Sequence, residues 1–226
     1  MKLTYYGHSC LAVHTAGKTL LFDPFIRPND RAKHINVEAV QADYLLISHG
    51  HFDHVADAVE IANRTGATLV SNYEISVWAA NQGVARTHGM NHGGAWKFDF
   101  GRVKYVPAIH SSSFADGSYA GHPGGFVIET AEGNFYFSGD TALTMDMKLI
   151  GESTSLQFAA LCIGDNFTMG VDDAIKAADF IRCKRIVGIH YDTFPPIQIH
   201  RQDAIGKFKA AGKDLLLPDI GETIVA

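Results

Sequence analysis

The stretch LLISHGHFDHVADAVE contains four potential metal ligands in six consecutive residues: His49, His51, Asp53 and His54. In an extended segment, residues two apart project to the same side of the backbone, so His49 and His51 can bind one cation together. Asp53 and His54 point away from that side as the chain turns into the helix expected to begin near Val55. There they can serve a second cation. The stretch therefore predicts two neighbouring metal sites built on one loop.

The remaining ligands must come from distant parts of the chain, because two histidines and an aspartate do not complete a metal coordination shell. Three candidates each follow an apolar, strand-like run: His110 after VPAI, Asp140 after YFSG and His190 after IVGI. Strand ends converge on one rim of a layered α/β fold, where binding sites tend to form. A carboxylate such as Asp140 can bridge two cations, and two cations about 3.5 to 4 Å apart are a recognised hydrolytic device.

Apolar periodicity indicates the elements that would position these residues. Apolar or alternating runs predict strands over residues 2–7, 10–15, 18–25, 43–48, 68–72, 95–100, 102–110, 124–130, 134–140, 156–164, 184–191, 215–218 and 222–226. Helical spacing predicts helices over residues 55–66, 74–83, 172–183 and 201–212. A hairpin turn is expected at Ala16-Gly17, and Gly66 is expected to end the first helix.

The order of these elements indicates the architecture. Two β-rich runs, each followed by strand–helix alternation, predict an α/β fold in which two sheets pack face to face with helices outside. The chain contains no repeat, low-complexity tract or linker, so we expect one domain over residues 1–226. With 46% hydrophobic residues, the chain can bury a sizeable core.

Composition excludes several classes of function. The net charge of −5 and the pI near 6.1 argue against a dedicated nucleic-acid-binding surface. Three scattered cysteines, Cys10, Cys162 and Cys183, support neither a disulfide framework nor a cysteine zinc site. There is no signal-peptide pattern and no apolar run of membrane-spanning length. We therefore expect a cytoplasmic protein that acts on a small molecule and has no membrane partner.

The motif HGHFDH matches HxHxDH, and with His110, Asp140 and His190 in that order it resembles the metallo-β-lactamase superfamily. The segments GHSC, LLFDPF, MNHGG, CIGDNFTMG and HYDTFP resemble its small cytoplasmic metal-dependent hydrolase branch, the UPF0173 or UlaG-like proteins. The resemblance covers nearly the whole chain. It implies a four-layer αβ/βα sandwich of two mixed β-sheets, and the branch has no settled common substrate.

The resemblance also implies a division of the ligands between two divalent metal ions. The first ion would be bound by His49, His51 and His110, and the second by Asp53, His54 and His190, with Asp140 as the bridge. Zinc suits the imidazole-rich first site, and the second would also accept manganese, iron or nickel. Asp53 would act in addition as the proton acceptor or donor that positions a metal-bound hydroxide.

Further residues are expected around the ligands. Asp23 is expected to hydrogen-bond a ligand imidazole and fix its tautomer. His8 is expected to be catalytic and to face the substrate. Asp165, Asn166 and Thr168 are candidates for contacts behind the ligands or at the rim of the site, although Thr168 also suits helix capping, as does Asp172.

The remaining rim and histidine predictions are less specific. Pocket-lining candidates that cannot be ranked are Phe25, Arg27, Phe114, Tyr119, Tyr191 and Phe194. The glycines of residues 88–94 predict a loop around His88 and His92. These two histidines are expected to have no role in metal binding, like His14, His34, His122 and His200.

The leading function is hydrolysis of an ester-type bond, with phosphodiesters and lactones favoured because both develop oxyanion charge that a cation stabilises. The alternative is a non-hydrolytic metal protein, either a diiron redox centre or a regulatory metal-binding module. Redox relatives tend to carry a carboxylate at the position of His51 and an added flavin domain. This chain has a histidine at that position, which disfavours the redox alternative. A homo-oligomer is left open, with residues 25–40 able to reach across a subunit boundary.

Overall fold

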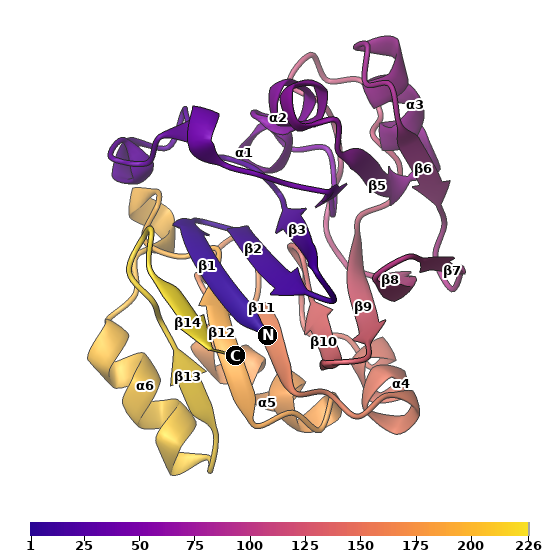
Figure 1. Ribbon diagram of the computed structural model, residues 1–226. Coiled ribbons are helices and arrows are strands. Elements are labelled where there is room, and N and C mark those ends of the chain that lie inside the picture. The colour runs from indigo at the N-terminus through magenta and orange to yellow at the C-terminus, as the bar shows by residue number, and fades with distance from the viewer. Residues whose placement is uncertain (226) are drawn as a thin grey trace.

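Across residues 1–225, which the computed structural model describes, the strands form two seven-stranded sheets (Figure 1). The first sheet has the order β14-β1-β2-β3-β4-β5-β6, antiparallel from β14 to β3 and parallel from β3 to β6. Its strands are β1 (Lys2–Gly7), β2 (Cys10–Thr15), β3 (Lys18–Phe22), β4 (Tyr44–Leu46), β5 (Thr68–Asn72), β6 (Thr87–Met90) and β14 (Thr223–Val225). Ala226, the last residue of the predicted terminal strand, lies outside the described residues.

The second sheet has the order β13-β12-β11-β10-β9-β8-β7, antiparallel from β7 to β10 and parallel from β10 to β13. Its strands are β7 (Ala95–Phe98), β8 (Gly101–Pro107), β9 (Gly124–Thr130), β10 (Gly133–Phe137), β11 (Phe158–Cys162), β12 (Arg185–Ile189) and β13 (Asp214–Leu216). Both sheets are therefore mixed, as the family resemblance implied.

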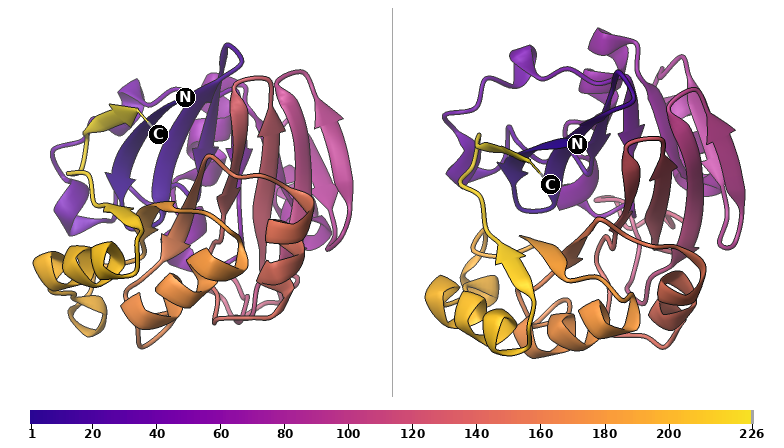
Figure 2. Two further views of the ribbon diagram at one scale, coloured as in Figure 1. Left: turned by 90° about the horizontal axis from the view of Figure 1, so that it is seen from below. Right: turned by 60° about the horizontal axis from the view of Figure 1, so that its bottom comes forward.

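Helices cover the outer faces of the two sheets (Figure 2). They are α1 (Phe52–Val55), α2 (Ala58–Thr65), α3 (Tyr73–Asn81), α4 (Asp146–Ser153), α5 (Val171–Phe180) and α6 (Arg201–Ala210), with the short 3-10 helices η1 (Asp30–Ala32), η2 (Val37–Ala39) and η3 (Pro195–Ile197). Helices α2 and α3 pack on β4, β5 and β6, whereas α5 and α6 pack on β11 and β13. The four-layer αβ/βα sandwich is confirmed. Among residues 1–225, no helix combines the length and apolar character that crossing a bilayer requires.

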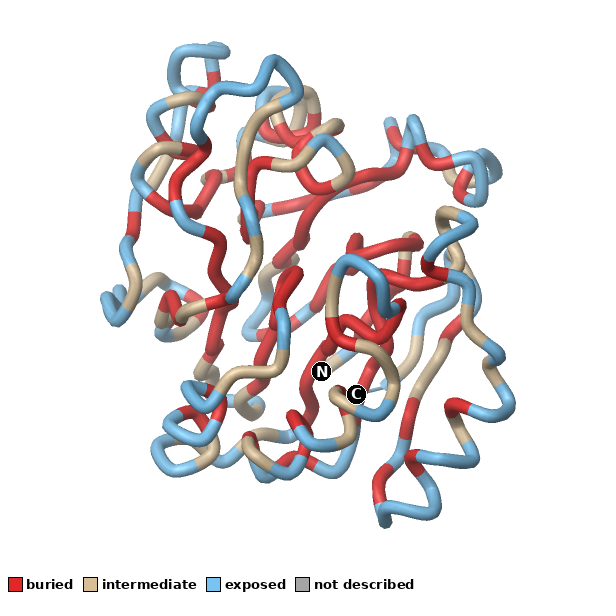
Figure 3. The backbone as a smooth tube through the Cα atoms, turned by 180° about the vertical axis from the view of Figure 1, so that it is seen from behind, coloured by how far each residue is buried: buried red, intermediate tan, exposed pale blue. Residues whose placement is uncertain are grey.

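The core between the sheets is built from aromatic side chains. Phe22 on β3 meets Phe126 on β9 and Phe135 and Phe137 on β10, with ring centroids 6.2, 5.9 and 4.6 Å away. All four rings are fully buried, and burying each contributes on the order of 2 kcal/mol. Figure 3 shows buried stretches of the backbone running through the interior of the molecule and exposed loops at its edges. The expectation of one domain over residues 1–226 stays a prediction, which this shared core supports.

Strand direction brings the predicted site residues to one edge. In the first sheet, β1, β3 and β4 run in the same direction, and in the second β8, β10 and β12 do. A candidate site residue follows shortly after the end of each of these strands. These residues are His8, Asp23, His49, His110, Asp140 and His190. Segments that are distant in the sequence therefore converge on one rim.

Two local signals in the sequence are confirmed by backbone geometry. Ala16 and Gly17 form the two-residue turn between β2 and β3, with φ of 49° and 71°, as a type I′ hairpin requires. Gly66 ends α2 in the left-handed conformation, with φ of 68°.

The glycine at the end of α2 makes a stability prediction possible. Gly66→Ala is expected to lower the free energy of unfolding by about 1 kcal/mol, because an alanine at positive φ is strained. Gly206→Ala lies inside α6, where a new Cβ would have no atom within 4 Å, and it is expected to raise that free energy by about 0.5 to 1 kcal/mol. Urea denaturation measures the free energy of unfolding of both variants. Changes of the same sign would contradict the left-handed conformation of Gly66 and the helical conformation of Gly206.

Two elements differ from the sequence predictions. Residues 87–90 form β6 rather than a loop, because Gly89 allows α3 to approach closely: a Cβ there would lie 2.6 Å from Ser76 Oγ. Helix α4 has no counterpart among the predicted helices. Its Gly151 weakens the helical signal, yet any Cβ at this position would collide with the Phe180 carbonyl oxygen of the neighbouring helix α5. In both places a glycine marks close packing.

Two helix starts also differ from expectation. The helix expected from Val55 is divided: α1 begins at Phe52, and α2 follows Asp57. Asp57 is buried and its carboxylate accepts hydrogen bonds from the backbone N–H groups of Ile26 and Arg27, so it holds the chain between the two helices. Helix α5 is preceded by Gly170 without a side-chain cap, so neither Thr168 nor Asp172 caps it.

Candidate metal centre

The first three predicted ligands form one cluster. Nitrogen atoms of His49, His51 and His110 all lie within 4.8 Å of one another, and His49 Nε2 is 3.0 Å from His51 Nδ1. His49 and His51 follow β4 and His110 follows β8, so the cluster joins the two sheets. Such a group of imidazole nitrogens has the chemistry of a zinc site.

A second cluster lies beside the first. One ligand atom from each of His8, Asp53, His54 and His190 lies within 4.8 Å of the others. Asp53 Oδ2 is 3.8 Å from His54 Nε2 and 3.9 Å from His190 Nε2. The short helix α1 positions Asp53 and His54, whereas His190 follows β12 and has the left-handed φ of 55°.

Asp140 lies between the two clusters. Its Oδ2 atom is 4.0 Å from His49 Nε2 and 3.6 Å from His110 Nε2 on one side. On the other side it is 3.4 Å from His54 Nε2 and 2.9 Å from His190 Nε2. One buried carboxylate oxygen therefore contacts or approaches an imidazole nitrogen from four separate histidines. This is the arrangement that a carboxylate bridging two cations requires.

Polar atoms without hydrogen bonds show that the cluster fits metal ions. Within residues 1–225, His54 Nε2, Asp140 Oδ1 and His190 Nδ1 are buried and make no hydrogen bond. Buried polar atoms are nearly always satisfied, and a coordinated cation would satisfy His54 Nε2, which faces Asp53 and Asp140. The set of imidazole nitrogens and carboxylate oxygens fits zinc and also manganese, iron or nickel.

Electrostatics favour positive charge at this position. Burial holds the pKa of His49 well below its ordinary value, and burial also lowers the pKa of His51 and of His110. These neutral rings keep a lone pair for a cation. Burial lowers the pKa of His54 too, but the carboxylates of Asp140 and Asp23 outweigh it and raise that pKa well above normal. Carboxylates that stabilise a proton on His54 would equally stabilise a metal ion.

Asp23 lies directly behind His54. Its Oδ2 accepts hydrogen bonds from His54 Nδ1 at 2.7 Å and Ser48 Oγ at 2.6 Å, and its Oδ1 accepts one from the Ser48 backbone N–H at 2.7 Å. Because Nδ1 of His54 carries the hydrogen in this contact, Nε2 is the atom left to face the cluster. We propose that Asp23 fixes the tautomer of His54.

The structure places His8 beside Asp53, away from the surface of the protein. Its side chain has no exposed surface, and its Nε2 lies 2.9 Å from Asp53 Oδ2. Burial lowers the pKa of His8 to about 4, so the ring is neutral and its single N–H can be donated to Asp53. The other nitrogen, Nδ1, then accepts a hydrogen bond from Thr193 Oγ1, 2.9 Å away. We propose that His8 positions Asp53 rather than contacting substrate.

Thr193 provides a test of this hydrogen-bonded chain. Thr193→Val removes the hydroxyl that selects the His8 tautomer, and we expect kcat/KM to fall about 10-fold. Thr193→Ser retains the hydroxyl and is expected to stay within about twofold of the wild type. Kinetics with metal content measured in parallel distinguish the two variants, and equal activities would contradict the proposed role.

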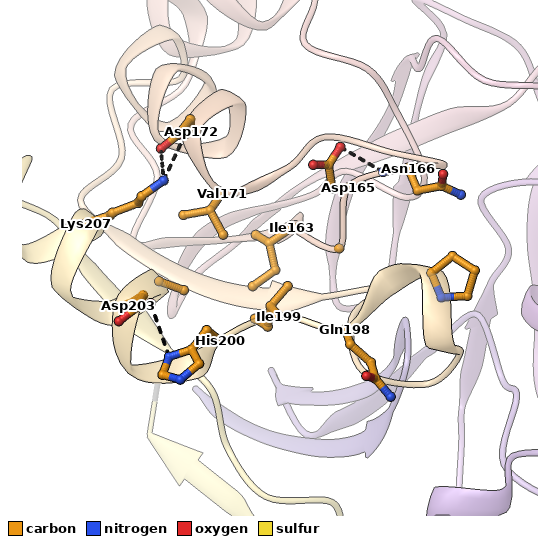
Figure 4. A pocket seen from close by; sticks show the side chains of 13 residues that line it. Ile163, Asp165, Asn166, Val171, Asp172, Gln198, Ile199, His200, Asp203 and Lys207 are labelled. Carbon is orange, nitrogen blue, oxygen red and sulfur yellow. Dashed lines mark hydrogen bonds and ion pairs between the residues drawn. The ribbon is translucent and has the colours of Figure 1, made fainter.

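The three candidates in the CIGDNFTMG segment do not contact the predicted ligands through any of their hydrogen bonds. The backbone N–H of Asp165 bonds to Met169, that of Asn166 to Asp165, and the Thr168 hydroxyl to Met169. Asp165 and Asn166 line a separate cavity of about 550 Å³ beside the starts of α5 and α6, where Lys207 pairs with Asp172 (Figure 4). A role for these three residues in the metal site stays a prediction.

The cavity that opens on the metal cluster has a volume of about 280 Å³. It is lined by His51, Asp53, His110, Ser111, Asp140, Phe167, His190 and Phe194. Phe194 is among the rim candidates from the sequence, whereas Phe167 is not. The only available signal for Phe167 was an aromatic residue in a glycine- and asparagine-containing segment, and that pattern does not specify which way a side chain points.

Comparison with known proteins identifies the family. Residues 2–190 match the family model described as the β-lactamase superfamily domain. A UPF0173 metal-dependent hydrolase from Flavobacterium johnsoniae is 55% identical over 224 residues, covering 99% of both chains. The chain belongs to the metallo-β-lactamase superfamily. A further UPF0173 metal-dependent hydrolase of this superfamily, from Methylacidiphilum infernorum, is 48% identical over 100% of both chains.

Solved structures of this superfamily agree with that assignment. The novel metallo hydrolase Igni18 from Ignicoccus hospitalis is 35% identical, with a TM-score of 0.89 over 99% of this chain and 97% of that one. The isothiocyanate hydrolase from Delia radicum gut bacteria has a TM-score of 0.79, covering 100% of this chain and 99% of that one, but it is 20% identical and shows the fold alone. The protein is a metal-dependent hydrolase of the metallo-β-lactamase superfamily with a His/Asp cluster able to bind metal.

Proposed function

We propose that this protein binds two divalent metal ions, zinc in the first instance, and hydrolyses an ester-type bond in a small molecule, with phosphodiesters and lactones as the favoured classes. The observation that carries the proposal is Asp140 Oδ2 lying 2.9 to 4.0 Å from the Nε2 atoms of four histidines. His49, His51 and His110 would hold one ion. Asp53, His54 and His190 would hold the other, with Asp140 shared.

The chemistry follows from the ions and from the residues around them. Two bound cations supply Lewis acidity, lowering the pKa of coordinated water toward about 7 and stabilising negative charge on the oxygen under attack. Burial raises the pKa of Asp53, but His54 and His8 outweigh it and hold that pKa below its ordinary value. The carboxylate at the cavity wall is therefore ionised and able to accept a hydrogen bond from the attacking water and orient it, while His8 holds the carboxylate in position.

The volume of the cavity, about 280 Å³, supports a small molecule as the substrate, because a cavity of this size is too small to enclose a whole drug-sized ligand. We also propose a cytoplasmic location, which the three free and buried cysteines support. Assembly into a homo-oligomer through residues 25–40 remains a prediction that size-exclusion chromatography checks.

Metal removal and replacement test the proposed function. Dialysis against a chelator is expected to abolish hydrolysis, and adding back zinc, manganese or nickel is expected to restore it to different extents. Elemental analysis should find two metal ions per chain in the most active preparation. The substrate panel comprises lactones, phosphodiesters and thioesters. A reversible iron redox signal without hydrolysis of any panel member would favour the diiron redox alternative instead.

A further inference from the structure

Phe167 is presented to the metal cavity by an anchored loop. Gly164 and Gly170 form a β-bridge at its base, and the backbone N–H of Asp165 bonds to the Met169 carbonyl oxygen at 3.1 Å. Met169 is buried, and its own N–H bonds to the Thr141 carbonyl oxygen at 3.0 Å, next to Asp140. Phe167, at the apex, is 53% exposed and still lines the metal cavity. The loop thus holds a large apolar side chain in water beside the reaction site.

The backbone of this loop is strained where it approaches Phe167. Asp165 and Asn166 both have left-handed conformations, with φ of 63° and 55°. Such conformations cost free energy for residues other than glycine and persist where the surrounding structure enforces them. The strain supports a specific placement of Phe167 rather than a passive surface turn.

A second aromatic residue, Phe194, lines the cavity and packs against the buried ring of Phe25. The ring centroid of Phe194 lies 5.4 Å from that of His8 and 6.3 Å from that of Phe25. Phe25 in turn meets Phe52 edge to face at 5.9 Å, and Phe52 is 52% exposed. These contacts form a continuous aromatic strip, defined by Phe194, Phe25 and Phe52.

No lysine or arginine lines the metal cavity within the described residues 1–225. Guanidinium groups on nearby segments are engaged elsewhere: Arg31 donates to the Asp192 carbonyl oxygen, Arg201 to the Asp192 carboxylate, and Arg27 to Glu38 and Glu60. An anionic group held outside the metal ions would therefore find no cationic partner on the cavity wall. An apolar group would instead cover Phe167 and Phe194 and remove them from water.

We propose that the substrate is a neutral ester or lactone that carries an apolar hydrocarbon or aromatic group, with Phe167 and Phe194 as the residues that bind this group. The inference rests on the proposed hydrolytic function and narrows it to carboxylic esters and lactones whose group outside the metal ions is neutral and apolar. In the reaction, water adds to the acyl carbon and the acyl C–O bond breaks. One proton of the water ends on the leaving alkoxide oxygen and the other is released to solvent. The products are a carboxylate and an alcohol, which in a lactone remain in one molecule.

A lactone series of increasing chain length tests the specificity. The series comprises γ-butyrolactone, γ-hexalactone, γ-octalactone and γ-decalactone. We expect kcat/KM of the metal-loaded wild type to rise roughly threefold for each of the first few methylene groups added. In Phe167→Ala and Phe194→Ala, the ratio of kcat/KM for the longest to the shortest lactone is expected to fall at least about 10-fold. Leu149→Ala, an exposed apolar residue of α4 that lines a different cavity, is the matched control and should leave the ratio unchanged.

Binding of n-alkyl amides separates this inference from the proposed function, because these neutral ligands resist hydrolysis. Calorimetric titration of the metal-loaded wild type should show affinity rising with chain length, and Phe167→Ala should abolish the rise. If no ester, lactone or phosphodiester is hydrolysed but this binding trend holds, the proposed function fails and the apolar subsite stands. Equal kcat/KM across the lactones, or a preference for bis(p-nitrophenyl) phosphate over every lactone, would overturn the inference. Absence of both hydrolysis and chain-length-dependent binding would overturn both.

Discussion

Asp140→Asn is expected to lower kcat/KM by a factor on the order of 10³ and to reduce the bound metal to one ion or fewer per chain. Burial raises the pKa of Asp140, but His190 and His54 outweigh it and hold that pKa well below its ordinary value. The group is therefore a carboxylate at all ordinary pH values. An asparagine has nearly the same shape but lacks the negative charge that offsets the repulsion between two neighbouring cations.

Metal content and kinetics must be measured together for this variant. Asp30→Asn is the matched control, because its side chain is 86% exposed and pairs with the exposed Lys33 on the surface. The control should retain two metal ions and full activity. If Asp140→Asn kept both ions and normal turnover, the shared-carboxylate arrangement on which the proposed function rests would be wrong.

Asp23→Ala has the second large expected effect, on stability and on metal affinity at once. The substitution leaves the buried Ser48 N–H and hydroxyl and the His54 Nδ1–H without their acceptor. Removing one partner of such a buried charged network costs about 3 to 5 kcal/mol. Without Asp23, the imidazole of His54 can also rotate or change tautomer, so metal affinity should fall about 10- to 100-fold.

Two measurements on the same preparation distinguish these effects. Urea denaturation of the metal-free protein reports the loss of stability, and competition with a chromophoric chelator reports the loss of metal affinity. Asp23→Asn keeps one oxygen acceptor and is expected to lose less stability than the alanine variant. Asp219→Ala, whose side chain is 87% exposed, should change neither quantity. Unchanged metal affinity in Asp23→Ala would show that His54 does not depend on this carboxylate.

The sequence by itself determined the ligand types and the elements that deliver them. Short apolar runs identified the strands that precede His49, His110, Asp140 and His190, because strands inside a layered fold are covered on both faces. The spacing of His49 and His51 placed both imidazoles on one side of an extended segment, and the structure brings their nitrogens within 3.0 Å. Turn chemistry was equally local: Gly17 and Gly66 have the positive φ that their positions require.

The tertiary structure alone decided which further groups surround the predicted ligands. His8 and Thr193 are separated by 185 positions, and His8 and Asp53 by 45, yet the three form one hydrogen-bonded chain. Nothing in the local pattern around His8 distinguishes a substrate-facing imidazole from one buried behind a carboxylate. The outward direction of Phe167 likewise depends on the anchoring of its loop to Thr141. Periodicity reports which face of an element is buried, whereas contacts between strand ends depend on how two whole sheets pack together.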